Sequence, residues 1–195
     1  NDIIVAGRLD VARDFLMQFK EHITEGGTVM DIGACLGDFT ATLSEFVGPA
    51  GRVYAFEPNP PVFNCLIHNM RHYSNVTSYS FALGAPLTGR AAIVEDAHNI
   101  GASRLTPSKK GSVAINWLDN ITHDWERLDF IKIDAEGYEP WILDGGIQTL
   151  RRFRPSMLIE IDQRALGFQG FKPVDIHTRL DDLKYDYPHF DGPHG

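Results

Sequence analysis

Residues 28–37 have the sequence TVMDIGACLG, in which a short apolar segment leads into a loop bounded by Gly33 and Gly37. Residues 28–32 have the length and apolar character of a buried strand, and helical spacing of apolar residues begins directly after Gly37. A strand that passes through a glycine-bearing loop into a helix is typical of parallel sheets, because neighbouring parallel strands need a crossover connection. The stretch therefore predicts an α/β fold.

The same alternation of strands and helices continues along the chain. Strands are predicted at 52–56, 77–83, 130–134 and 155–161. Helices are predicted at 8–23, from the glycine loop to Gly48, from Pro60 to Met70, at 138–152 with a break at Gly145-Gly146, and at 174–183. Between them, 84–116 has the texture of turns and short strands. We expect a doubly wound, mostly parallel Rossmann-like sheet whose ligands bind beyond the carboxyl ends of its strands.

The length of 195 residues and the ordinary composition predict a single domain. We expect a helical lead-in at 1–27, a cofactor-binding core at 28–162, and a C-terminal helix and tail at 163–195. No apolar run approaches the roughly 20 residues needed to cross a bilayer, so no membrane span is expected. The two cysteines, Cys35 and Cys65, are too sparse for a disulfide framework, which favours a cytoplasmic location. The oligomeric state stays open.

The charge of the chain bears on its partners. The formal net charge is −8, and no basic stripe is evident that would release counterions from a nucleic acid. We therefore expect a small-molecule partner and no nucleic acid.

The loop at 33–37 and the acid Glu57 together predict a nucleoside cofactor. Glu57 lies at the tip of the next strand, twenty residues past Gly37, which is where a carboxylate accepts the hydroxyls of a ribose. A dinucleotide site would require a further glycine that lets the backbone approach a pyrophosphate, and that glycine is absent. Asp31 instead places an anion before the loop, which suits the cationic amino group of S-adenosylmethionine. S-adenosylmethionine is thus favoured over a nicotinamide dinucleotide.

Three segments together resemble the FkbM methyltransferase family. They are VMDIGACLG at 29–37, GRVYAFEP at 51–58 and FIKIDAEGYE at 130–139, and the last of them is the most specific. Weaker family features follow in order at 82–84, 99–102 and 154–160. The resemblance implies a class I methyltransferase fold, S-adenosylmethionine as methyl donor, and O-methylation of a hydroxyl on a sugar or a natural-product-like small molecule.

Two departures from the family pattern stand out. Cys35 occupies a position where the family usually has Asn, which affects one side-chain contact near the methionine part of the cofactor. The chain also continues only a short way past the strand at 155–161. The antiparallel hairpin that usually closes a seven-stranded class I sheet is therefore expected to be shortened or missing.

These segments define the expected site. The residues expected to contact the cofactor are Asp31, Gly33, Ala34, Cys35, Gly37, Asp38, Phe39, Glu57, Pro58, Ala82 and Asp134. Because the acceptor hydroxyl must lose a proton, a base is expected near the mouth of the strand at 130–134. The candidates are Asp134, which we expect to position the hydroxyl and take its proton, then Glu136 and His123. For Glu136 a second interpretation stays open, in which it caps the following helix.

Several further expectations concern the surroundings of this base. A buried Lys132 needs a partner, for which Asp134 and Glu160 are the candidates. Asn99, Gly101 and Ser103 form either a lid over the acceptor or a plain hairpin. Glu160 and Asp162 supply oxygen ligands, but packing and capping explain them as well, so no metal is expected. Two competing hypotheses are an NAD(P)-binding oxidoreductase and a non-catalytic Rossmann-like binding module.

Overall fold

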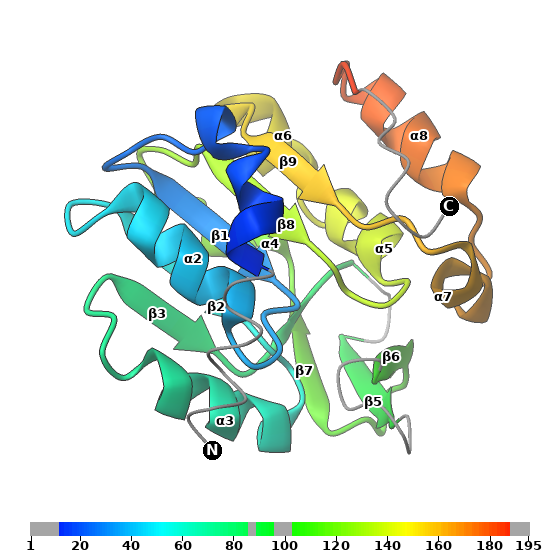
Figure 1. Ribbon diagram of the computed structural model, residues 1–195. Helices are drawn as coiled ribbons and strands as arrows, with labels where there is room; N and C mark the ends of the chain where they lie inside the picture. Colours follow the sequence, from blue (N-terminus) through cyan, green and yellow to red (C-terminus); the bar gives the residue numbers. More distant parts are fainter. Residues whose placement is uncertain (1–11, 86–88, 96–102, 188–195) are drawn as a thin grey trace.

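The computed structural model describes residues 12–85, 89–95 and 103–187 (Figure 1). Its main sheet has only parallel neighbours, in the order β3-β2-β1-β8-β9. The bounds of its strands are β1 Thr28–Ile32, β2 Arg52–Phe56, β3 Val76–Tyr79, β8 Phe130–Ile133 and β9 Ser156–Ile159. The predicted doubly wound, mostly parallel sheet is confirmed, with the strand of the glycine loop at its centre.

Helices cover both faces of this sheet (Figure 1). One face packs against a helical segment at 12–17, α2 (Asp38–Val47) and α3 (Pro60–Met70), and the other against α4 (Leu118–Ile121), α5 (Glu139–Asp144) and α6 (Ile147–Phe153). Successive side chains of a strand point to opposite faces. Val29 accordingly packs with Leu43 of α2, whereas Ile32 lies in the cluster of Ile142 and Leu150. Because both faces are covered, every residue of β1 and β8 is buried, and most of them are apolar.

The turn-rich segment between β3 and β8 forms a second, smaller sheet. Its strands are β4 (Ala82–Leu83), β5 (Arg90–Val94), β6 (Arg104–Pro107) and β7 (Val113–Asn116), in the order β4-β7-β5-β6. The predicted strand at 77–83 is therefore divided, since residues 80 and 81 form a bend and β4 leaves the main sheet to pair with β7. Figure 1 places β5 and β6 beyond the carboxyl ends of the main strands.

The two ends of the core differ in part from expectation. The N-terminal helix covers 12–17 and gives way to a 3-10 turn, η1 (Lys20–His22), while 1–11 lie outside the described residues. After β9 come α7 (Gln163–Phe168), which was not predicted, and α8 (Pro173–Asp182), which was. Within the described residues no strand follows β9. None of the described helices is long and apolar enough to cross a membrane.

Candidate functional site

A cavity of about 310 Å³ lies at the carboxyl ends of β1, β2 and β8. The small sheet closes one side of it through Ser103 and Leu105. A volume of this size lies at the lower end of the range for small-molecule sites, about 300–1,000 Å³. Of the predicted site residues, those that line the cavity are Gly33, Ala34, Cys35, Asp38, Phe39, Glu57, Pro58, Ala82, Asp134 and Glu136.

Three predicted residues lie elsewhere. Asp31 is fully buried inside β1 and faces α2, because its place in the strand points its side chain to that face and not to the strand end. Gly37 lies against Leu66 and Met70 of α3. His123 precedes β8, so it lies near the start of that strand; its ring is exposed, and Nδ1 is 2.9 Å from the carbonyl oxygen of Asn120. The structure therefore does not bring His123 to the cavity.

The glycine loop lies in close contact with the end of β8. Gly33 has φ +80°, and a Cβ at this position would lie 1.7 Å from the backbone oxygen of Asp134. The N–H groups of Gly33 and Ala34 both donate to the carbonyl of Phe56, at 3.0 Å each. Only glycine allows this combination of left-handed backbone and close approach. The loop is consequently fixed between β2 and β8.

Cys35 adopts a left-handed backbone as well, with φ +49°. Among residues other than glycine, Asn, Asp and His are enriched in this region. The backbone therefore gives a physical reason why Asn is the usual residue at this position, separate from any side-chain contact. Cys35 adopts the same left-handed backbone at a higher conformational cost than Asn would.

Glu57 connects the tip of β2 to the glycine loop. Its Oε2 accepts a hydrogen bond of 3.0 Å from the N–H of Cys35, and its Oε1 accepts one of 2.8 Å from the N–H of Asn59. Burial raises the pKa of Glu57, although the two backbone N–H groups oppose that shift. Each oxygen keeps a lone pair beyond these bonds, so the buried carboxylate is able to accept further donors from the cavity.

Lys132 and two carboxylates form a buried group beside the loop. The Lys132 Nζ lies 3.4 Å from Asp31 Oδ1 and 3.2 Å from Asp134 Oδ2. The predicted pairing of Lys132 with Asp134 is confirmed, and the pairing with Asp31 was not predicted. Burial lowers the pKa of Lys132, but the two carboxylates raise it above its ordinary value. The ammonium is therefore charged.

Asp134, Glu136 and Glu160 place three carboxyl groups on the cavity wall. Burial raises the pKa of Asp134, yet Lys132 and a hydrogen bond with Glu160 hold it below its usual value. The hydrogen bond with Asp134, followed by burial, raises the pKa of Glu160 to about 8. Burial and the charges of Asp134, Asp162 and Glu139 raise the pKa of Glu136 to about 7. At neutral pH Asp134 is thus ionised, Glu160 holds a proton, and Glu136 is poised to exchange one.

Other acids than Glu136 bind the backbone N–H groups of the turn before α5 and of the start of α7. Oε1 of Glu139 accepts from the N–H groups of Ala135 (2.9 Å) and Gly137 (3.2 Å), and Oδ1 of Asp162 accepts from the first residues of α7. The sequence analysis missed this role of Glu139, whose carboxylate folds back onto the turn that precedes its own helix. Because Glu139 ties the turn between β8 and α5, Glu136 is left with its carboxyl in the cavity.

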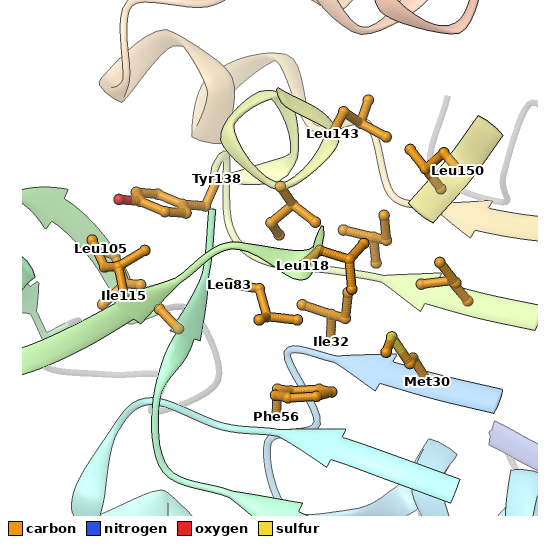
Figure 2. Close-up of a cluster of buried hydrophobic side chains, with 14 of the residues drawn as sticks. Met30, Ile32, Phe56, Leu83, Leu105, Ile115, Leu118, Tyr138, Leu143 and Leu150 are labelled. Atoms are coloured by element: carbon orange, nitrogen blue, oxygen red, sulfur yellow. The ribbon is translucent and has the colours of Figure 1, made fainter. Parts of the chain in front are cut away.

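The wall opposite the glycine loop was also missed by the sequence analysis. It is largely apolar and includes Phe81, Leu83, Leu105, Tyr138 and Ile142. Figure 2 shows the Tyr138 ring at one end of the core cluster, beside Leu105 and Ile115, with its hydroxyl pointing away from the centre. That hydroxyl and Ser103 Oγ have no hydrogen-bond partner in the part of the chain that the structure describes. Asn99 and Gly101, the other expected lid residues, lie outside the described residues.

No arrangement for a metal is evident at these acids. Within 12–85, 89–95 and 103–187, no three His, Cys, Asp or Glu side chains are placed to hold one ion.

Comparisons with known proteins bear on the family and the fold of the chain. The model of the methyltransferase FkbM domain matches residues 31–187. Fibrillarin from Aeropyrum pernix, crystallised with natively bound S-adenosyl-L-methionine, superimposes with a TM-score of 0.53 at 19% identity, over 87% of this chain and 63% of its own. Precorrin-6y C5,15-methyltransferase from Geobacter metallireducens gives a TM-score of 0.51 at 17% identity, over 91% and 71%. The chain thus spans less than two thirds of the fibrillarin, and these likenesses concern the fold. No curated protein matches the sequence.

Proposed function

The chain belongs to the FkbM methyltransferase family, and we propose that it transfers the methyl group of S-adenosylmethionine to a hydroxyl oxygen of a small molecule. The observation that supports this most is the cavity at the strand ends, which is lined by the glycine loop, by Glu57 and by a cluster of carboxyl groups. We propose a sugar or a natural-product-like compound as the acceptor. Incubating a metabolite extract with methyl-labelled donor and identifying the labelled product tests this directly.

The residues around the loop fit the proposed methyl donor. Gly33 lines the cavity, and because it has no Cβ its backbone is able to lie directly against the end of β8. Glu57 is held by two backbone N–H groups and keeps lone pairs for a ribose diol. Asp134 supplies an anion on the cavity wall, and Asp38 and Phe39 of α2 line the same side. These residues match a ligand that has a nucleoside at one end and a cationic group at the other.

Replacing Glu57 is expected to weaken the binding of S-adenosylmethionine. Glu57→Gln keeps the shape but turns one acceptor into a donor, which should cost about 1.5–3 kcal/mol, the range for a hydrogen bond to a charged group. Calorimetric titration measures the change, with Glu126→Gln, an exposed acid before β8, as the control. Unchanged affinity in a folded Glu57→Gln protein would remove Glu57 from the donor site. Titrating NAD in parallel tests the oxidoreductase hypothesis.

We propose Glu136 as the base that takes the proton of the acceptor hydroxyl. When bound, S-adenosylmethionine would supply the methyl group from its sulfonium and leave as S-adenosylhomocysteine. Catalysis by the chain then consists of aligning the hydroxyl and accepting its proton. A general base works best when its pKa lies near the operating pH, as that of Glu136 does at about 7. Asp134, ion-paired with Lys132, is the weaker proton acceptor and serves as a fixed negative charge.

The charges around the cavity support a neutral acceptor. Asp134, Glu136 and Glu160 all line it, and the whole chain has a formal net charge of −8. A polyphosphate acceptor would be repelled by these groups, since nucleic acids are bound through clustered Lys and Arg. A hydroxyl compound meets no such penalty, and its further hydroxyls are able to satisfy Tyr138 and Ser103.

Turnover is expected to persist after treatment with EDTA. Glu160 and Asp162 are engaged with Asp134 and with the start of α7, so that their oxygens are committed to the chain. The measurement is methyl transfer before and after dialysis against the chelator, with and without added Mg²⁺. Loss of turnover that Mg²⁺ restores would contradict this expectation.

A further inference from the structure

Lys132 occupies a position that an alkyl side chain would ordinarily take. It is the third residue of β8, between the buried Ile131 and Ile133, and it is 4% exposed. A fully buried lysine has to be paired, because desolvation of an ammonium costs several kcal/mol. The chain bears this cost at the edge of the donor loop, where the charge is in a position to influence the site.

The strand register explains how one ammonium reaches two acids. Lys132 and Asp31 are direct partners across β8 and β1, so their side chains lie side by side on the face that α2 covers. Asp134 follows two residues later, and residues i and i+2 of a strand share a face. Nζ therefore lies between Asp31 Oδ1, at 3.4 Å, and Asp134 Oδ2, at 3.2 Å.

Further contacts tie this group to the donor side of the cavity. Lys132 Nζ donates to the Gly33 carbonyl at 3.3 Å and lies 4.7 Å from the centroid of the Phe39 ring. Thr40 Oγ1 donates to Asp31 Oδ2 at 2.6 Å. One ammonium thus contacts β1, the glycine loop, the first turn of α2 and the end of β8. Of these groups, Gly33, Phe39 and Asp134 line the cavity.

Asp134 depends on Lys132 to stay ionised, because the other charged groups nearby are acids. The groups around Lys132 and Asp134 are all acids: Asp31 in β1, Glu57 after β2, Glu136 in the turn after β8, Glu139 in α5 and Glu160 after β9. Arg104 of β6 faces Glu136. Without the ammonium, Asp31 and Asp134 would be like charges in a partly buried place, and one of them would take up a proton.

We propose that Lys132 is a positioning residue for the methyl donor: it neutralises Asp31 and holds Asp134 as a fixed anion against the glycine loop, where that anion favours a sulfonium over a neutral thioether. The proposal rests on the proposed use of S-adenosylmethionine. It assigns to the buried lysine a role in distinguishing the donor, which has a sulfonium, from S-adenosylhomocysteine, the product of methyl transfer, whose sulfur is a neutral thioether.

The test compares two variants that differ only at position 132. Asp31→Asn keeps the Thr40 contact and the pair of Lys132 with Asp134. Asp31→Asn/Lys132→Met removes the ammonium together with its buried partner, which avoids leaving a lone buried charge. Thermal unfolding of both variants checks that they fold. The affinities of S-adenosylmethionine and S-adenosylhomocysteine are then titrated calorimetrically across the pH range below the pKa of Glu136.

The wild-type and Asp31→Asn proteins are expected to keep their preference for S-adenosylmethionine as the pH falls. In the double variant Asp134 has lost the ammonium that lowers its pKa while burial still raises it, so Asp134 is expected to take up a proton as the pH falls. The preference should then fall by about tenfold, the usual size of one interaction with a charged group. Equal ratios of the two affinities in all three proteins at every pH would overturn the role of Lys132. If the wild-type protein binds neither compound, it is the proposed methyl donor that fails.

Discussion

Glu136→Gln is expected to lower kcat by about 10²–10⁴-fold while the affinity for S-adenosylmethionine stays close to the wild-type value. The amide keeps the size of the side chain but is unable to accept the proton of the acceptor hydroxyl. Donor binding should change little, because Glu57 and Asp134 belong to the loop side of the cavity and stay intact. Steady-state kinetics on the identified acceptor, with calorimetry on the donor, measure the two effects separately.

The pH dependence distinguishes Glu136 from its neighbours. In the wild-type protein kcat should rise with pH through about 7, because the base is active only after losing its proton and burial has raised its pKa to that value. In Glu136→Gln this rise of kcat with pH should vanish. Glu126→Gln, which alters an exposed acid, should retain it. If kcat of Glu136→Gln still rose with pH through about 7, the base would be another group. Glu160, whose pKa is raised to about 8, would then be the first candidate.

The parallel sheet was predictable because its information is local. Buried strands such as 28–32 and 130–133 are short apolar runs, and helices between them have their own spacing of apolar residues. Glycine at 33 and an acid at 57 follow directly after strands. Since the carboxyl ends of parallel strands meet at one edge, their convergence required no knowledge of tertiary contacts.

The rest of the site depends on contacts between distant segments. The sequence predicted a partner for Lys132, but Asp31 became one only through the register of β1 and β8. The apolar wall with Leu105 and Tyr138 arises because β4 leaves the main sheet and the small sheet folds over the strand ends. His123 precedes β8 by several residues, and its distance from the cavity follows from the direction in which that strand runs. No local pattern contains this information.

The glycine loop yields the second large effect, which is expected for Gly33→Ala. The new Cβ would lie 1.7 Å from the backbone oxygen of Asp134, and backbone atoms are unable to rotate away as a side chain does. The loop or the end of β8 must therefore shift, in addition to the cost of about 1–2 kcal/mol for a left-handed backbone at a residue with a Cβ. We expect a loss of about 2–5 kcal/mol in the free energy of unfolding, since overpacking adds roughly 1–3 kcal/mol to the conformational cost.

Gly26→Ala is the matched control for this change. Gly26 has a similar left-handed backbone, with φ +72°, but no atom lies within 4 Å of a Cβ built there. The free energy of unfolding of Gly26→Ala should fall only by the conformational cost, about 1–2 kcal/mol. The variant should bind S-adenosylmethionine as the wild-type protein does. Gly33→Ala displaces the loop that Glu57 and Lys132 both contact, so donor affinity should fall together with stability. Chemical denaturation and calorimetry measure the two quantities. If Gly33→Ala and Gly26→Ala had the same stability and the same affinity for S-adenosylmethionine, the close approach of the loop to β8 would have no part in binding the methyl donor.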